Sequence, residues 1–267
     1  MRILFIGDII GKPGRLAVKA ILPEIIGQQD IDFVIANGEN CAGGFGINID
    51  IVDALLSYGV DVITGGNHFW DRKEIGVVFE KCDKILRPAN YPESVQGNGA
   101  GVFNDKHGRK VGVLNLQGRT FMTPIDCPFR TADKEVPELR RKTNVVIVDF
   151  HAEATSEKQT LAYYLDGRVA AIIGTHTHVQ SADERIFPNK TGYITDVGMT
   201  GPYHSVIGME YPAALHRFIT GTPARFKVAT KDVRFAAVIV ETDHRNGNCL
   251  SMERIFVSTD DYAAAEG

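Results

Sequence analysis

The chain has 267 residues, a hydrophobic content of 44%, a charged content of 23% and a net charge of −4 at pH 7. This composition suits a globular protein with a sizeable core, and it excludes a global basic field for nucleic-acid or membrane binding. The four cysteines form no CxxC pair, which argues against a disulfide framework and fits a reducing compartment. No apolar run approaches the ~18 residues of a transmembrane helix, so we expect a single cytoplasmic domain spanning residues 1–267.

The first part of the chain alternates short apolar strands with helices. Strands are predicted at Ile3 to Ile6, Asp32 to Ala36, Asp61 to Ile63 and Lys84 to Leu86. Helices are predicted from about Arg15 with a break or kink at Pro23, from the N-cap Asn48, and from a capping box of Asp71 and Glu74 to about Lys81. A hairpin follows, made of Gly101 to Asn104 and Lys110 to Leu116.

The second part begins with the same alternation and then becomes rich in strands. Helices are predicted from Ala132 to Lys142, from a capping box of Ser156 and Gln159, and around Tyr211 to Ile219. The predicted strands are Asn144 to Phe150, Arg168 to Ile173, Tyr193 to Thr195, Arg225 to Val228, Val233 to Glu241 and Asn248 to Val257. The tail from Asp260 is expected to fray.

Side chains able to bind a metal follow five of these strands directly. They are Asp8, Glu39 and Asn40, Asn67 and His68, His151, and His176 and His178. Because the carboxyl ends of strands line the functional crevice of an α/β sheet, these groups converge if the strands share one sheet. Each has an ordinary interpretation alone, such as a helix N-cap for Asp8 or a satisfied core histidine for His151. Their repetition at the same structural position favours a common site.

The donors are oxygen and nitrogen atoms without a thiolate, which suits Fe, Mn, Co, Ni or Zn and argues against copper or an iron–sulfur cluster. They are too many for one tetrahedral zinc, and they fit two ions that share one carboxylate, for which Glu39 is the natural candidate. Two divalent ions would outweigh the charges of Asp8 and Glu39, so the site should attract an anion such as phosphate. Centres with two ions ~3.5–4 Å apart hold both the attacking and the leaving oxygen in phosphoryl displacement.

The ordered motifs of this site resemble those of the calcineurin-like metallophosphoesterases. They are Asp8, Gly38-Glu39-Asn40, Gly66-Asn67-His68, His151 and His176-Thr177-His178. Three stretches are similar to the YmdB-like branch in particular: Gly7-Asp8-Ile9-Ile10-Gly11, Asn37-Gly38-Glu39-Asn40 and Gly65-Gly66-Asn67-His68-Phe69-Trp70-Asp71. The resemblance extends from residue 1 to about residue 200. The chain departs from the superfamily pattern at Ile10, where a histidine is usual, and at Glu39, where an aspartate is usual.

The resemblance implies a four-layer αββα sandwich, with two mixed sheets face to face and helices outside. It implies two metal ions, with iron the expected metal, and phosphodiesterase action on cyclic nucleotides, 2′,3′-cyclic ones in particular. Asn40 is the candidate to replace the ligand missing at Ile10. The implied ligands are Asp8, Glu39, Asn40 and His178 for one ion, and Glu39, Asn67, His151 and His176 for the other.

The expected reaction is an in-line attack on phosphorus by hydroxide formed at the ions. His68, beside Asn67, is expected to protonate the leaving oxygen, the alternative being a structural histidine behind the ligand. Phe45 is predicted to stack on a base, and His204 in a later Gly/Pro loop is predicted to contact substrate. Candidates to orient the ligand imidazoles are Asp149, Asp183 and Asp196.

Two other functions stay open from the sequence. One is a metal-dependent hydrolase of C–N or C–O bonds, and the other is a regulatory protein that binds nucleotide or RNA at its metal site with little turnover. The sequence has no basic stripe that would support strong RNA binding. The predicted partner is therefore a small phosphodiester or cyclic nucleotide, without a membrane or strong nucleic-acid binding, and self-association is left open.

Overall fold

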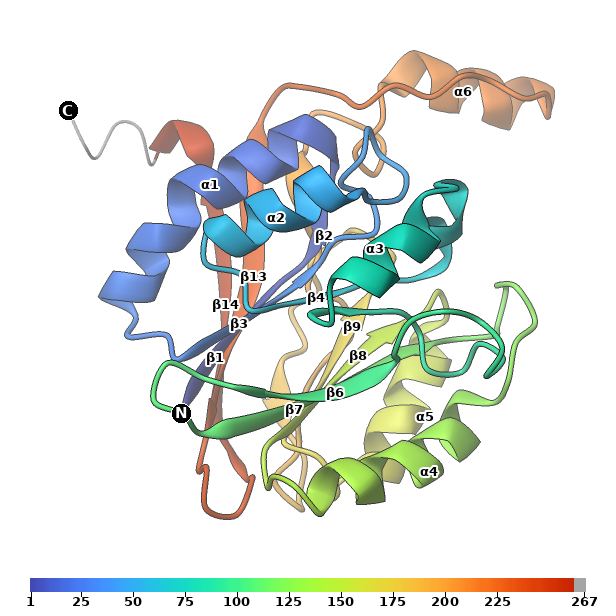
Figure 1. The fold of residues 1–267 in the computed structure, drawn as a ribbon. Coiled ribbons are helices and arrows are strands. Elements are labelled where there is room, and N and C mark those ends of the chain that lie inside the picture. The colour runs from blue at the N-terminus through green and yellow to red at the C-terminus, as the bar shows by residue number, and fades with distance from the viewer. Residues whose placement is uncertain (262–267) are drawn as a thin grey trace.

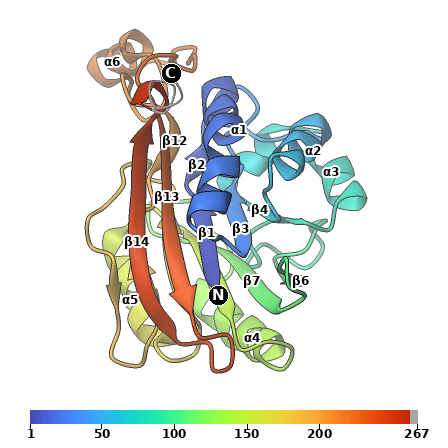
Figure 2. The same cartoon turned by 90° about the vertical axis from the view of Figure 1, so that its left-hand side faces the viewer.

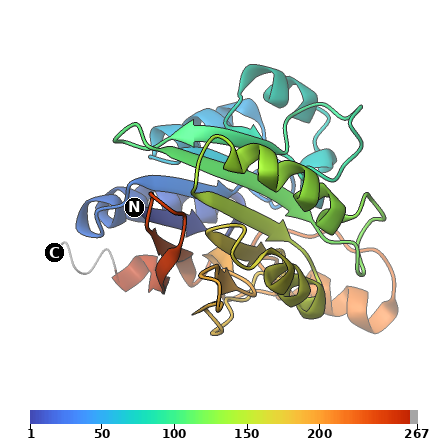
Figure 3. The same cartoon turned by 90° about the horizontal axis from the view of Figure 1, so that it is seen from below.

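Two β-sheets lie face to face, with helices on the outer side of each (Figures 1 and 3). The structure is a computed structural model that describes residues 1–261. The predicted αββα sandwich is confirmed, since three buried apolar layers separate four layers of secondary structure. The tail predicted from Asp260 lies largely outside the described residues.

The larger sheet has eight strands. In spatial order they are β2 (Asp8–Ile9), β12 (Met199–Pro202), β13 (Val233–Thr242), β1 (Arg2–Ile6), β3 (Phe33–Asn37), β4 (Val62–Thr64) and β5 (Ile85–Leu86), with β14 (Cys249–Ser258) paired to β13. From β1 to β5 the neighbours are parallel, whereas β13 is antiparallel to β1, β12 and β14. The long β13–β14 hairpin stands at one side of the molecule (Figure 2).

The smaller sheet has six strands. In spatial order they are β10 (Arg185–Ile186), β11 (Gly192–Ile194), β9 (Ala171–Thr175), β8 (Val146–His151), β7 (Lys110–Gln117) and β6 (Ala100–Asn104). The inner neighbours are parallel, and the outer strands β6 and β10 are antiparallel to the strands beside them. The hairpin of β6 and β7 is the predicted one.

Of the helices α1 to α6 named within residues 1–261, α1 to α5 cover the outer faces of the sheets and α6 projects away from them (Figure 1). The larger sheet carries α1 (Gly11–Gln28), α2 (Ile49–Ser57) and α3 (Ile75–Lys81). The smaller sheet carries α4 (Pro128–Arg140) and α5 (Thr155–Leu165), whereas α6 (Tyr211–Thr220) projects beyond the sandwich. None of the helices within residues 1–261 combines the length and apolar character needed to cross a membrane.

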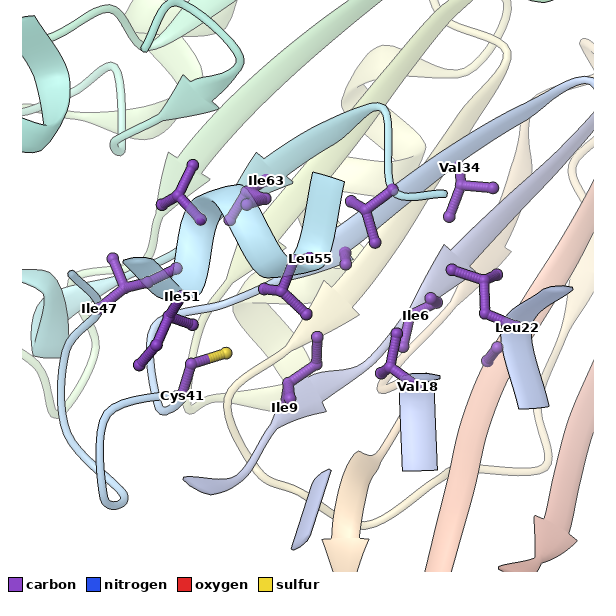
Figure 4. Packing of buried hydrophobic residues seen from close by; sticks show 14 of the residues in the cluster. Ile6, Ile9, Val18, Leu22, Val34, Cys41, Ile47, Ile51, Leu55 and Ile63 are labelled. Carbon is purple, nitrogen blue, oxygen red and sulfur yellow. The ribbon is translucent and has the colours of Figure 1, made fainter. Parts of the chain in front are cut away.

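The alternation of side chains along each strand builds the layered core. In β1, Leu4 and Ile6 face the helices α1 and α2, whereas Ile3 and Phe5 face the other sheet. This follows from the two-residue repeat of a strand, and it explains why strands covered on both faces are continuous apolar runs. Figure 4 shows side chains of α1 and α2 packing on the larger sheet.

The predicted capping box of Asp71 and Glu74 is wrong. Residues Asn67–Asp71 form a 3-10 turn, and α3 begins only at Ile75, with no side-chain cap from Glu74. Asp71 is therefore the last residue of the 3-10 turn, and its carboxylate does not cap α3. The box predicted from Ser156 fails similarly, because α5 already begins at Thr155.

The predicted break at Pro23 is also wrong, because α1 continues through it. Pro23 has no backbone N–H, so the carbonyl of Lys19 loses its helical hydrogen bond. Both residues lie on the exposed side of α1, where water can replace that bond.

The prediction of a strand from Arg225 to Val228 is wrong, since only Val228 forms an isolated bridge, to Met209. Conversely, the short strands β2, β10 and β12 were not predicted. Such short strands depend on partners far along the chain, as β2 does on β12, and not on a local pattern.

Candidate metal centre

The predicted ligands meet at the end of the sandwich where strands of both sheets terminate. Asp8, Glu39 and Asn67 follow or lie beside the ends of β1, β3 and β4 in the larger sheet. His151 ends β8 and His176 follows β9 in the smaller sheet. The five strands therefore do not share one sheet, as the simplest form of the prediction required. The side chains still converge because the two facing sheets end at the same side.

Glu39 lies at the centre of the cluster. Its carboxylate and the imidazoles of His151 and His176 offer atoms that all lie within 4.8 Å of one another. His151 Nε2 is 3.1 Å from Glu39 Oε1 and 3.0 Å from His176 Nδ1. Asp8 Oδ1 lies between two imidazoles, 3.8 Å from His178 Nε2 and 3.9 Å from His151 Nδ1. Asp8 therefore links His178 to the trio of Glu39, His151 and His176. Three carboxylate and imidazole donors in such proximity are suited to a cation.

Three oxygen atoms of the predicted ligands are buried without a hydrogen bond from any of residues 1–261, namely Asp8 Oδ1, Asn40 Oδ1 and Asn67 Oδ1. A fourth buried oxygen, Glu39 Oε1, has the imidazole of His151 at 3.1 Å as its neighbour. Asn40 donates its amide to Gly44 O at 3.0 Å, which leaves its carbonyl oxygen as the unpaired atom. Buried polar atoms normally find a partner, since leaving one unsatisfied costs about 1–3 kcal/mol. The donor set fits metal ions, because each orphaned atom is an oxygen that can bind a cation.

The electrostatics of the cluster also call for positive charge. Burial raises the pKa of Asp8, whereas at Glu39 burial is outweighed by His151, which lowers the pKa of Glu39 to about 2. Burial acts against protonation of His151, but Glu39 and Asp8 raise its pKa to about 9. Burial and the neighbouring His151 lower the pKa of His176 to about 3. The carboxylates of Glu39 and Asp8 thus favour positive charge at this cluster, which a bound cation would supply.

Outer side chains hold the imidazole of His151. Its Nδ1 lies 3.0 Å from Thr175 Oγ1, and that hydroxyl donates to Asp149 Oδ1 at 2.8 Å. Asp149 Oδ2 also accepts from Thr64 Oγ1 at 2.5 Å and from Asn37 Nδ2 at 3.2 Å. Burial raises the pKa of Asp149 to about 7. Asp149 therefore acts on His151 through a hydroxyl, a link that the sequence alone does not reveal.

The other two imidazoles have partners that the sequence did not suggest. His176 Nε2 lies 3.1 Å from Glu153 Oε2, and His178 Nδ1 lies 3.0 Å from the backbone oxygen of Ile207. Glu153 is in an exposed turn without any pattern that marks it. Asp183, proposed from sequence for such a role, instead accepts from the hydroxyl of Ser181.

The turn that carries His176 and His178 is strained and is fastened by Asp196. Both histidines have positive φ, 98° and 65°, which non-glycine residues rarely adopt. Asp196 Oδ2 accepts from Thr177 N at 3.0 Å and from Thr177 Oγ1 at 2.7 Å. Lys158 Nζ donates to the same oxygen at 2.8 Å, and both side chains are 1% exposed. The buried ion pair therefore holds the segment between the two predicted ligands.

Gly66 allows Glu39 and His151 to approach each other. A Cβ atom at Gly66 would lie 2.1 Å from His151 Cδ2 and 2.6 Å from Glu39 Oε2. No real Cβ makes such contacts, so a side chain here would displace one of the two groups.

His68 stands beside this cluster with one side in solvent. Its backbone N–H donates to Glu39 Oε2 at 3.0 Å, and its ring packs edge-on against Phe45 with centroids 5.1 Å apart. Its Nδ1 lies 2.7 Å from Asp71 Oδ2. This role of Asp71 was not predicted, although its place three residues after His68 is a usable signal.

Two further positions complete the comparison with the sequence. His204 is exposed and its backbone N–H donates to Lys231 O, and it is not among the side chains that line the hollow next to His68. Ile10 is fully buried and packs against Gly201 and Gly208, so an apolar contact occupies the position where the superfamily usually has a histidine.

Facing mixed sheets with outer helices, and a cluster of carboxylates, amides and imidazoles at their shared end, define a metallophosphoesterase. A family profile described as YmdB-like protein matches residues 4–255. The chain belongs to this YmdB-like family of the metallophosphoesterase superfamily.

Relatives are similar over almost the entire chain. A Bacillus subtilis (strain 168) protein named 2′,3′-cyclic-nucleotide 2′-phosphodiesterase is 46% identical over 260 residues, covering 97% of this chain and 98% of that protein. The crystal structure of a hypothetical protein from Thermus thermophilus has a TM-score of 0.90 at 43% identity, covering 97% of this chain and 99% of that one. The crystal structure of a novel phosphatase from Mycoplasma pneumoniae also has a TM-score of 0.90, at 35% identity, covering 99% and 96%.

Proposed function

We propose that this phosphoric diester hydrolase uses two transition-metal ions to open cyclic nucleotides, with a preference for 2′,3′-cyclic phosphates. The observation that carries the proposal is the close trio of Glu39, His151 and His176, together with the buried oxygens of Asp8, Asn40 and Asn67 that lack hydrogen bonds from residues 1–261. The name of the Bacillus subtilis relative supports the choice of substrate.

The ligands would divide between two metal positions that share Glu39. Asp8, Asn40 and His178 would hold one ion with Glu39, and Asn67, His151 and His176 would hold the other. The 3.8 Å approach of Asp8 to His178 and the close trio of Glu39, His151 and His176 agree with this division. Bound cations lower the pKa of water and neutralise charge on phosphoryl oxygens. Iron is the metal we propose, with Mn, Zn, Co and Ni as the alternatives.

His68 is proposed to donate the proton to the leaving ribose oxygen. As an imidazolium, His68 would donate Nδ1–H to Asp71 and carry a second proton on Nε2, which is the proton given to the leaving oxygen. The contact with Phe45 and the bond from its backbone to Glu39 fix the position of the ring beside the ligands. Asp71 is therefore a positioning residue, since it acts through His68.

The first test combines metal analysis with a choice of substrates. We expect the purified protein to hold two metal equivalents per chain, iron above the others, and to hydrolyse 2′,3′-cyclic AMP faster than 3′,5′-cyclic AMP. Removal of the metal with a chelator should abolish hydrolysis, and added metal should restore it. Tight nucleotide binding without turnover in the metal-loaded protein would instead favour the regulatory alternative.

The role of His68 has its own test, based on the leaving group. His68→Asn should lower kcat for 2′,3′-cyclic AMP by about 10²–10⁴-fold, because the ribose oxygen then leaves unprotonated. The same variant should show a much smaller loss of kcat with bis(p-nitrophenyl) phosphate, because nitrophenolate is a good leaving group and does not need a proton. His107→Asn, the same replacement at a histidine that pairs with Asp32 away from the cluster, is the matched control. Equal losses for both substrates would mean that His68 is only structural.

A further inference from the structure

A hollow of about 400 Å³ opens directly beside the candidate metal centre. Three of the residues that line it are Asn40, His68 and His178, which the proposed function places around the phosphate. The remaining lining is mostly apolar and includes Phe45, Met209, Phe218 and Phe226. Its volume falls within the range of about 300–1,000 Å³ found for small-ligand sites. A molecule held by its phosphate would therefore extend its other end into an aromatic hollow.

Two hydrogen bonds from Arg72 fasten the near wall of the hollow. Arg72 Nε donates to Phe45 O at 3.0 Å, and a second guanidinium nitrogen donates to Ala42 O, which together fasten the loop that carries Phe45. Gly44, at φ +98°, lets this loop touch the opposite wall, because a Cβ there would lie 2.6 Å from Met209 Cε.

The opposite wall is formed by the segment from Val206 to Phe226, which includes α6. It is tied to the candidate centre, since Ile207 O lies 3.0 Å from Nδ1 of His178. Only Ala214 of α6 is buried, while Phe218 lines the hollow with 86% of its surface exposed. The helix projects beyond the sandwich in Figure 1. The exposed ring of Phe218 beside the candidate centre offers apolar surface to a ligand that enters the hollow.

We propose that this hollow is the nucleobase subsite, in which Phe45 and Phe218 hold the base of a nucleotide whose cyclic phosphate lies at the metal centre. The inference rests on the proposed function, because it takes the phosphate to be anchored there. Every base offers a flat face to an aromatic ring, so stacking should support binding of all four nucleotides. Arg217 also lines the hollow, and its guanidinium lies 5.8 Å from the centre of the Phe226 ring, so this cation packs on an aromatic face of the hollow. The segment that carries Phe218 would make the enzyme favour cyclic nucleotides over base-free cyclic phosphates.

The test compares 2′,3′-cyclic AMP with a base-free analogue, methyl ribofuranoside 2′,3′-cyclic phosphate, on the metal-loaded protein. Both kcat/KM and the Kd from calorimetry are measured for each compound. The wild-type protein should favour the nucleotide, and Phe218→Ala and Phe45→Ala should each lower that preference about tenfold, mainly through KM and Kd. Ile219→Ala removes the neighbouring side chain of α6, which is 72% exposed and outside the hollow, and should leave the preference unchanged.

Two results would overturn the subsite. One is equal use and equal binding of the two compounds by the wild-type protein. The other is a preference that survives both phenylalanine variants, even if Phe218→Ala alters the oligomeric state, since α6 would then be a protein contact. Failure of the proposed function is a separate result: nucleotide binding that depends on Phe218 but leads to no hydrolysis supports the subsite and rejects the reaction.

Discussion

Glu39→Gln is expected to lower kcat/KM for 2′,3′-cyclic AMP by roughly three orders of magnitude, or about 4 kcal/mol of transition-state free energy. Glu39 is fully buried, and its carboxylate reaches both His151 and the backbone of His68. The amide keeps the shape of the side chain but removes the negative charge that would bridge two cations. Metal content should fall with activity, to one equivalent or less per chain.

The fold should survive this replacement, because Gln has nearly the same volume as Glu. The circular dichroism spectrum should therefore match that of the wild-type protein. Glu138→Gln is the matched control, since Glu138 forms an exposed ion pair with Arg141 on α4. A Glu39→Gln enzyme with unchanged kinetics and two bound metal ions would refute the bridging role.

Lys158→Met should destabilise the protein by about 3–5 kcal/mol, the range for removing one partner of a buried ion pair. Lys158 Nζ donates to Asp196 Oδ2 at 2.8 Å and to Thr175 O at 2.7 Å, and both acceptors are buried. Without it, the buried carboxylate of Asp196 loses the cation that compensates its charge, and the turn through Thr177 loses its support. The measurement is urea denaturation at matched metal content, followed by the metal affinity of the folded variant.

Lys134→Met is the control for this second result. Lys134 pairs with Glu93 at 2.8 Å, but these side chains are 66% and 90% exposed. Water already solvates both charges, so the loss should stay within about 0.5 kcal/mol. If Lys158→Met costs no more than Lys134→Met, the buried pair does not support the turn of the two histidines.

Strands and helices were predictable from the sequence where a local pattern of residues, such as an apolar run or an N-cap, determines them. The continuous apolar runs of β1, β3, β8 and β9 are strands because both of their faces are covered. Asn48 was predicted as an N-cap, and its side chain accepts from Ile51 N at 3.0 Å. Where a pattern had two local meanings, the prediction failed. Asp71 has the spacing of a capping box, yet its carboxylate turns back to His68.

The sequence by itself determined which residues follow the strand ends. The order of residues places Asp8, Glu39, His151 and the pair His176 and His178 directly at or after the apolar strand segments, and these side chains can bind metal. Only the tertiary structure decided how they meet, since they come from two sheets whose distance depends on packing between them. It also decided their supports, namely Thr175 with Asp149, Glu153, and Lys158 with Asp196. These contacts join residues that are distant in the chain or have no local signature, so no window of sequence contains the forces that create them.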